Sequence, residues 1–148
     1  MNYDPTCIFC RIIAAEVPAS VVYRDEDVMA FMDNRPVNPG HLLVIPTIHA
    51  AGLAHLPETV GQRTWVVARR LAAAQRRSDL RCEGVNLFVA DGAAAGQDVF
   101  HVHIHVLPRF AGDGLQLTGF AYDQRPAPPA RAELERAAEA IKSALNTA

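Results

Sequence analysis

The chain has 148 residues, which is enough for one domain with a substantial hydrophobic core. Half of the residues are hydrophobic and 20% are charged, which indicates a globular protein and excludes an intrinsically disordered one. The formal net charge of -2 leaves no basic field to hold a nucleic-acid polymer, although a small nucleotide needs only a few local donors.

The predicted elements begin close to the N-terminus. No basic segment followed by an apolar one is present there, and no apolar run reaches the roughly 20 residues that span a bilayer, so we expect no signal peptide and no membrane partner. Residues 8–17 predict a short helix, and residues 20–23 and 28–33 predict two strands around a charged turn. A third strand, 41–45, is bracketed by Gly and Pro, which limit its length, and His41 at its start is expected to be structural.

The second half of the chain predicts a long helix, two strands and a terminal helix. The long helix begins at Pro57, where a missing N–H costs nothing, and apolar residues at helical spacing carry it to about Arg77. Residues 85–89 predict a strand, and loop 90–98 leads into a histidine-bearing strand that Pro108 ends. The terminal helix places four apolar residues on one face: Leu134, Ala138, Ile141 and Leu145. The predicted class is α+β, with a mainly antiparallel sheet, one long central helix and a C-terminal helix.

The run His101-Val102-His103-Ile104-His105 carries the most chemical information. In an extended strand alternate side chains share a face, so the three imidazoles would lie on one face, roughly 6–7 Å apart. A face given to histidine suits chemistry at phosphate, carbonyl or metal. The alternative is three buried histidines with separate partners, which would be costly to satisfy.

A loop of small residues precedes the histidine run. Residues 91–97 include two glycines, and such a loop lets backbone N–H groups approach an anion closely. The Gln97 amide is a candidate donor to a phosphate oxygen. A hairpin turn with an incidental glutamine is the alternative, but the position directly before His101 favours a phosphate cradle.

Three stretches of the sequence resemble the histidine-triad (HIT) family of nucleotide hydrolases and transferases. They are residues 96–109 (GQDVFHVHIHVLPR), residues 40–46 followed by His49, and residues 30–33 with Pro36. The resemblance covers about residues 7–109. It implies a HIT-like fold and a single HIT domain over residues 1–148, in which residues 110–148 form a variable C-terminal segment.

The resemblance also implies a mechanism. His103 would be the nucleophile at the α-phosphorus of a nucleotide, and water would release the nucleotide from a covalent nucleotidyl-histidine. Neutral imidazole suits this role near pH 7, because its ordinary pKa is about 6.5. His105 would face the phosphate or the leaving group, and Asp33 would accept hydrogen bonds from ribose hydroxyls. The expected substrate-binding residues are Asp33, Asn86, Gln97, Asp98 and His105, and the expected catalytic residues are His103 and His105.

Ala90 departs from the family pattern, in which this loop position usually carries an amide side chain. Alanine offers no side-chain hydrogen bond, so one contact near ribose or phosphate is missing or comes from another residue. Asn86 is the candidate for that contact.

The favoured function is therefore an enzyme, a hydrolase that acts on a nucleoside phosphoramidate or nucleotide ester, with a purine nucleotide as its expected ligand. Two alternatives stay open within the resemblance: a nucleotide- or metal-binding interaction module with little turnover, and a dinucleoside polyphosphate hydrolase. A third interpretation takes the three histidines as a catalytic metal face. It ranks last because no carboxylate base is evident nearby.

Cys7 and Cys10 form a Cys-x-x-Cys pair, a spacing typical of a metal knuckle. Zinc favours four thiolate or imidazole ligands, and the resemblance to bacterial HIT proteins implies that His49 and His101 complete a structural zinc site. Two ordinary buried thiols are the alternative; a redox pair is weaker because no strand precedes it. Three cysteines are too few for a disulfide framework, so we expect a reducing, cytoplasmic location.

The resemblance further implies a homodimer, with the long helix and a neighbouring strand at the two-fold interface. In that helix Val60, Val67 and Leu71 form one stripe, and Trp65 points away from it. A helix that is apolar on more than one face needs a second surface to cover it, and tryptophan is enriched at interface hot spots. The alternative is that Trp65 packs under the C-terminal helix of its own chain.

Overall fold

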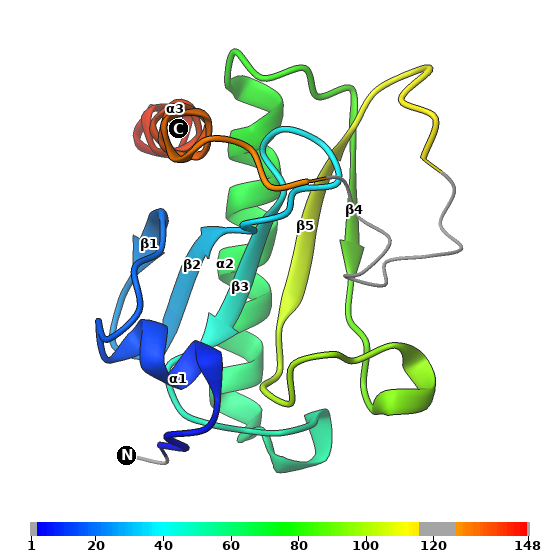
Figure 1. Cartoon of the computed structure of the whole chain (residues 1–148). Helices are drawn as coiled ribbons and strands as arrows, with labels where there is room; N and C mark the ends of the chain where they lie inside the picture. The colour runs from blue at the N-terminus through cyan, green and yellow to red at the C-terminus, as the bar shows by residue number, and fades with distance from the viewer. Residues whose placement is uncertain (1–2, 116–126, 148) are drawn as a thin grey trace.

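The computed structural model describes residues 3–115 and 127–147. Within these residues, five strands form one antiparallel sheet in the order β1-β2-β3-β5-β4 (Figure 1). The strands are β1 (Val21–Arg24), β2 (Val28–Met32), β3 (Leu42–Pro46), β4 (Gly84–Phe88) and β5 (Ile104–Arg109). The helices are α1 (Ile8–Ile13), α2 (Glu58–Arg77) and α3 (Arg131–Asn146), with short 3-10 turns η1 (Leu53–His55) and η2 (Ala93–Ala95). The predicted α+β class is confirmed.

Helix α2 lies along one face of the sheet and follows the predicted bounds closely. Pro57 occupies the N-cap position, directly before the first helical residue, where its missing backbone N–H removes no hydrogen bond of the helix. Glu58 stands in the first turn and Arg76 and Arg77 in the last, so the side-chain charges complement the helix dipole.

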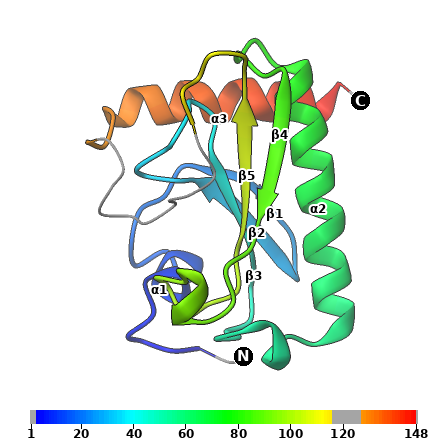
Figure 2. The ribbon, with the colours of Figure 1, turned by 90° about the vertical axis from the view of Figure 1, so that its right-hand side faces the viewer.

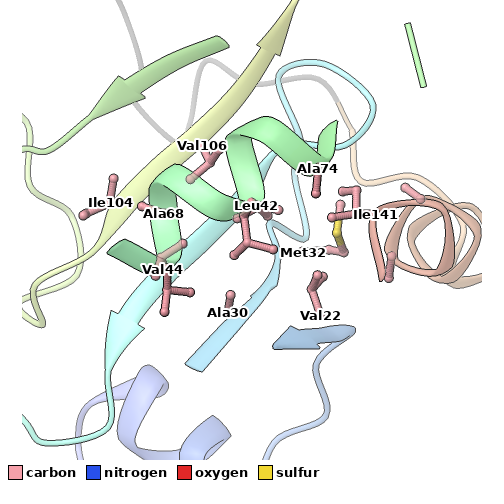
Figure 3. Packing of buried hydrophobic residues seen from close by; sticks show 14 of the residues in the cluster. Val22, Ala30, Met32, Leu42, Val44, Ala68, Ala74, Ile104, Val106 and Ile141 are labelled. Carbon is pink, nitrogen blue, oxygen red and sulfur yellow. The ribbon is translucent and has the colours of Figure 1, made fainter. Parts of the chain in front are cut away.

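The face of the sheet toward α2 buries aliphatic side chains. The cluster in Figure 3 joins the strands to α2 and α3, and it includes Ala30, Val44, Leu42, Val106, Leu71 and Ile141. Each large side chain that is fully buried in this way stabilises the fold by about 1.5–3 kcal/mol. The cluster on this face is the larger of the two hydrophobic clusters among the described residues.

The opposite face of the sheet carries the side chains that alternate with that cluster. Met29, Phe31, Leu43 and Ile45 pack there with residues of α1, chiefly Phe9. Part of this face is formed by one row of cross-strand partners, which runs from β5 to β1: His105, Leu43, Phe31 and Val21. This row places a histidine of the triad in register with apolar residues on three neighbouring strands.

Helix α3 crosses one end of the sheet. In Figure 2 its N-terminal end lies on the α1 side of the sheet and its C-terminal end lies beside α2. An Arg77 side chain from the end of α2 donates to the Ala144 carbonyl at 3.2 Å. The predicted apolar face of α3 is buried, with Leu134, Ala138 and Ile141 in the core cluster.

The prediction that the strand includes His101 to His103 is wrong. Strand β5 begins only at Ile104. The backbone N–H of His101 bonds to Val99, and that of Val102 bonds to Ala50, so this segment is held by loops and not by the sheet. The alternation of the sequence was a sound guide to the sheet only where a partner strand was present.

Pro108 does not end β5 but lies inside it. It is paired with Val85 on β4. On the other side, the pairing of β5 with β3 stops at Val106 and Leu42, so the missing N–H of Pro108 removes no bond to β3.

The first helix is shorter than predicted, because it ends at Ile13 and not at residue 17. Ala15 adopts a left-handed backbone with φ of 60°. The amides of Glu16 and Val17 both return to the Arg11 carbonyl, which closes the helix.

Trp65 is 54% exposed on α2. The alternative in which it packs under α3 is therefore wrong; α3 packs on the Leu71 side of the same helix. Among the described helices, none combines the length and apolar character that a membrane crossing requires.

Candidate functional site

A cavity of about 390 Å³ opens on the α1 side of the sheet. Its floor includes Phe31, Leu43 and His105 from the cross-strand row. The remaining lining comes from α1, from the segment that leads into β1, from the end of β2, from the loop before His101 and from the start of α3: Ile8, Phe9, Ile12, residues 17–20, residues 32–34, Asp98, Val99, His103, Arg131 and Leu134. The cavity is thus mostly apolar, with histidines and carboxylates at one end.

His103 presents an unprotonated nitrogen to this cavity. Its Nδ1 lies 2.7 Å from the His101 carbonyl oxygen, and it is 2% exposed. A carbonyl oxygen can only accept, so we infer that Nδ1 carries the proton. Nε2 is then the basic nitrogen of the ring, and it lies 4.0 Å from a carboxylate oxygen of Asp98. A neutral imidazole with this tautomer is a competent nucleophile.

His105 has the tautomer opposite to that of His103, with its proton on Nε2. Two hydrogen bonds that involve His41 determine this tautomer. The backbone N–H of Val37 donates to His41 Nδ1 at 3.2 Å, so His41 carries its proton on Nε2. That nitrogen lies 2.9 Å from His105 Nδ1, which must accept. The proton of His105 therefore resides on Nε2. The two adjacent imidazoles, with ring centroids 4.9 Å apart, therefore combine an unprotonated Nε2 on His103 with an Nε2–H on His105.

The sequence analysis did not connect His41 with the histidine run, because His41 was expected to be structural. It is fully buried directly before β3, and its Nε2 lies 3.7 Å from an Asp33 carboxylate oxygen. The available signal was a lone histidine at the start of an otherwise apolar strand. Its partner His105 is 64 residues away, so local spacing could not connect them.

Asp33 and Asp98, two of the predicted substrate-binding residues, line the cavity with both catalytic candidates. Asp33 is 3% exposed and accepts the backbone N–H of Arg35 through Oδ1. The Asp98 side chain is 40% exposed at the cavity mouth. The structure therefore brings both carboxylates to the end of the cavity that holds the histidines.

Gln97 and Asn86 do not face the cavity. The Gln97 amide nitrogen donates to the carbonyls of Ala51 and Val99, at 2.8 and 3.0 Å, and its oxygen accepts from Gly92. Gln97 therefore braces the loop, and both of its donor hydrogens are used. The Asn86 amide oxygen on β4 accepts from Arg109 at 2.6 Å, and Asn86 is not among the residues that line the cavity.

A second cluster lies behind His103, between α1 and the segment that carries His101. The ligand atoms of Cys7, Cys10, His49 and His101 all lie within 4.8 Å of one another. Cys10 Sγ is 3.3 Å from His49 Nδ1, and His101 Nδ1 is 3.6 Å from Cys7 Sγ and 3.7 Å from Cys10 Sγ. The structure brings together all four predicted ligands.

The donor chemistry of this cluster fits zinc. Two sulfurs and two imidazole nitrogens are a set that Zn²⁺ takes in tetrahedral sites. His101 Nε2 lies 2.9 Å from the Pro46 carbonyl, so it donates there and leaves Nδ1 free to ligate. Burial lowers the pKa of His101 to about 4, which keeps the ring neutral as ligation requires. Burial also raises the pKa of the Cys10 thiol, which opposes the thiolate form, so zinc binding there would have to displace that proton.

Comparison with known proteins agrees with this geometry. Residues 14–112 match the HIT domain family. An uncharacterized HIT-like protein of Borreliella burgdorferi is 43% identical over 113 residues, which cover 76% of this chain and 80% of that protein.

Two solved structures resemble the whole fold. A zinc-bound histidine triad family protein from Mycobacterium smegmatis is 36% identical, covers 96% of this chain and 94% of its own, and has a TM-score of 0.84. A hypothetical histidine triad nucleotide-binding protein from Sulfolobus tokodaii is 27% identical, with 95% and 93% coverage and a TM-score of 0.82. The resemblance expected from the sequence is confirmed: this chain belongs to the histidine-triad family.

Proposed function

We propose that this protein is a nucleotide hydrolase that cleaves at the α-phosphate of a nucleoside phosphoramidate or nucleotide ester. The observation that carries the proposal is the pair of opposite tautomers at one end of the cavity. His103 offers a basic Nε2, and His105 offers an Nε2–H. Family membership and the nucleotide-binding neighbour from Sulfolobus tokodaii support a nucleotide as the ligand.

In the first step His103 Nε2 attacks the α-phosphorus. The new P–N bond forms as the bond to the leaving group breaks, and the leaving group takes a proton from solvent. The N–H of His105 donates to the oxygen or leaving atom where negative charge develops, and the hydrogen bond from His103 Nδ1 to the His101 carbonyl stabilises the cationic ring of the adduct.

In the second step water attacks the same phosphorus on the face opposite His103. The P–N bond breaks, the nucleoside monophosphate leaves, and the proton lost by water goes to solvent. His103 returns to its starting tautomer. Asp33 and Asp98 serve as acceptors for ribose hydroxyls or for the attacking water, and the apolar walls hold the base, for which a purine is the expected fit.

The test is an activity panel of adenosine and guanosine phosphoramidates and dinucleoside polyphosphates. We expect His103→Ala to abolish turnover while AMP or GMP binding stays measurable by calorimetry. His55→Ala is the matched control, because His55 is exposed on η1 and does not line the cavity. Turnover by His103→Ala within tenfold of wild type would refute the covalent mechanism.

We also propose that Cys7, Cys10, His49 and His101 hold one structural zinc ion. Zinc bound there would fix α1 against the His101 segment, whose carbonyl orients His103. The zinc-bound neighbour from Mycobacterium smegmatis supports the choice of metal. The cytoplasm is the proposed location, since its reducing conditions keep both thiols available.

Elemental analysis of protein purified without chelator should give close to one zinc per chain. Cys10→Ser should lose the metal, whereas Cys82→Ser, which alters the one cysteine outside the cluster, should retain it. Metal-free wild-type protein with unchanged thermal stability would contradict the site.

Finally, we propose a homodimer through α2. Trp65 and Val66 are exposed on this helix at 54% and 37%, which leaves apolar surface for a partner copy. Light scattering at micromolar concentration should report about twice the 16.1 kDa of one chain. Trp65→Asp should shift the protein to the monomer, and a monomeric wild type would refute the dimer.

A further inference from the structure

The start of α3 closes the end of the cavity that lies farthest from the catalytic histidines. Arg131 and Leu134, in its first turn, line the cavity together with Ser20, which precedes β1. Figure 2 shows this end of α3 on the α1 side of the sheet. Arg131 lies outside the matched residues 14–112, so family membership assigns it no role.

The spacing of the strands gives an estimate of the length of the cavity. His105, Leu43, Phe31 and Val21 are successive cross-strand partners, so three strand spacings separate His105 from Val21. At about 4.8 Å per spacing this is about 14 Å. A purine nucleotide in an extended conformation, with one polar contact at each end, spans a distance of this size. If the α-phosphate is at His103, the outer edge of the base reaches the Ser20 end of the cavity.

The side chains at that end are held in place. Arg131 Nε donates to Glu135 Oε1 at 2.8 Å, and Ser20 Oγ donates to the same oxygen at 2.9 Å. Ser20 is 3% exposed, so it anchors the pair to the body of the protein. No other described residue bonds to the terminal nitrogens of Arg131, which remain as donors at the cavity wall.

We propose that Arg131 is a specificity-determining residue, which donates hydrogen bonds to O6 and N7 of a 6-oxopurine and so favours guanine and hypoxanthine nucleotides over adenine nucleotides. The inference rests on the proposed function, because it takes the α-phosphate to lie at His103. Leu134, beside Arg131, supplies an apolar contact to the base.

Donor and acceptor chemistry explains the preference. Guanidinium has donors and no acceptor, and a 6-oxopurine presents two acceptors, O6 and N7, on one edge. Adenine presents N7 beside an amino group, which is itself a donor and opposes Arg131. A pyrimidine in the same pose is too short to reach the start of α3.

Charge favours a base edge over a second phosphate. Glu135 forms an ion pair with Arg131 at 2.8 Å, so the two side chains together carry no net charge. The pair therefore suits a neutral, polar edge better than an anion. The cross-strand distance of about 14 Å from His105 also exceeds that between adjacent phosphates in a polyphosphate.

The experiment is calorimetric binding of GMP, IMP and AMP to wild type and to Arg131→Met, which keeps the length of the apolar stem. IMP and AMP differ only at the 6-position and the adjoining ring nitrogen, so they test the contact directly. We expect wild type to bind IMP and GMP about tenfold more tightly than AMP, and Arg131→Met to lose that preference. A 7-deaza analogue of GMP should bind wild type more weakly than GMP does.

Arg136→Met is the matched control, since Arg136 is exposed on the same helix and does not line the cavity. Equal affinity of wild type for IMP and AMP, or an equal loss for all three nucleotides in Arg131→Met, would overturn the inference. These results leave the proposed function intact. If the nucleotides bind with a preference that depends on Arg131 but no substrate is hydrolysed, the proposed hydrolase activity is refuted and the inference about Arg131 stands. If no nucleotide binds at all, both are refuted.

Discussion

The two faces of the sheet bury different chemistry. Toward α2 the strands bury aliphatic side chains from β1 through β5. Toward α1 the same strands bury aromatic and apolar residues at the centre and His105 at the cavity. His103, directly before β5, and Asp33, directly after β2, are buried at the same cavity. Ile104 and Val106 lie on the first face, and His105, between them, lies on the second.

This contrast shows how one strand serves stability and chemistry at once. Because side chains alternate across a strand, the polar groups of the site are separated from the main core by the backbone alone. The aliphatic face should therefore set the free energy of unfolding, and the histidine face should set the rate of catalysis. Substitutions on each face test whether the two properties separate in this way.

The largest effect on stability is expected from Leu71→Ala. Leu71 is fully buried in α2 against the sheet, and such truncations cost about 2–5 kcal/mol. Urea denaturation measures the loss, while kcat/KM of the folded enzyme should change little. Arg136→Ala, at an exposed position of α3 outside the proposed dimer surface, is the control and should stay within about 0.5 kcal/mol of wild type. A large fall in the kcat/KM of the folded Leu71→Ala enzyme would show that the aliphatic face also sets the rate of catalysis.

On the histidine face, His105→Ala should lower kcat by about 10²–10³-fold, as loss of one charge-stabilising donor does. The reason is that its Nε2–H faces the developing charge. Steady-state kinetics on a phosphoramidate measures the change. An unchanged kcat would show that His105 has no part in the chemical step.

A smaller effect is expected from His41→Phe, which keeps a ring of similar shape but removes the donor that fixes His105. His105 can then take either tautomer, so we expect kcat to fall about tenfold, of the order of one hydrogen bond. KM should change less than kcat. A KM effect alone would indicate that His41 only shapes the cavity.

The smallest effect concerns Asp25, at the rim of the α2 face. Burial opposes its ionisation, but hydrogen bonds from Tyr23 and Arg63 outweigh this and lower the pKa of Asp25 from its ordinary value of 3.8 to about 2. A carboxyl group whose pKa is lower in the folded than in the unfolded chain stabilises the fold at pH values above its unfolded-state pKa. This stabilisation is lost as the pH falls through its folded-state pKa.

Asp25→Asn should therefore cost about 1 kcal/mol at pH 7, since solvent screening reduces the value of a partly exposed ion pair. The difference from wild type, followed by urea denaturation, should shrink as the pH falls from about 4 toward 2. A constant difference over this range would rule out Asp25 ionisation as its source.

The elements of the sheet and α2 were predictable because their patterns are local. Apolar spacing placed α2 within one residue of its start, and the charged turn before the apolar run at residue 28 placed β2 within one residue of both ends. The alternation of the histidine run misled at His101, because this residue contacts Cys7 and Cys10 from a distant part of the chain.

The site was predictable only where the motif itself carried it. The residues of the histidine run and the Cys-x-x-Cys pair could be assigned to two clusters before the fold was known. The His41–His105 contact could not, since it depends on the pairing of β3 with β5. The hydrogen bond from Gln97 to the Ala51 carbonyl could not be predicted either, because only folding brings that carbonyl near. Arg131 belongs to no motif, and only the packing of α3 places it at the cavity.

The proposed mechanism requires that His103 forms a covalent bond to phosphorus during turnover. The most direct measurement is the stereochemical course of hydrolysis with a substrate that is chiral at the α-phosphorus, such as a phosphorothioate of one configuration hydrolysed in isotopically labelled water. Two successive in-line displacements, by His103 and then by water, predict net retention of configuration. Net inversion would mean that water attacks the substrate directly, and it would contradict the covalent mechanism.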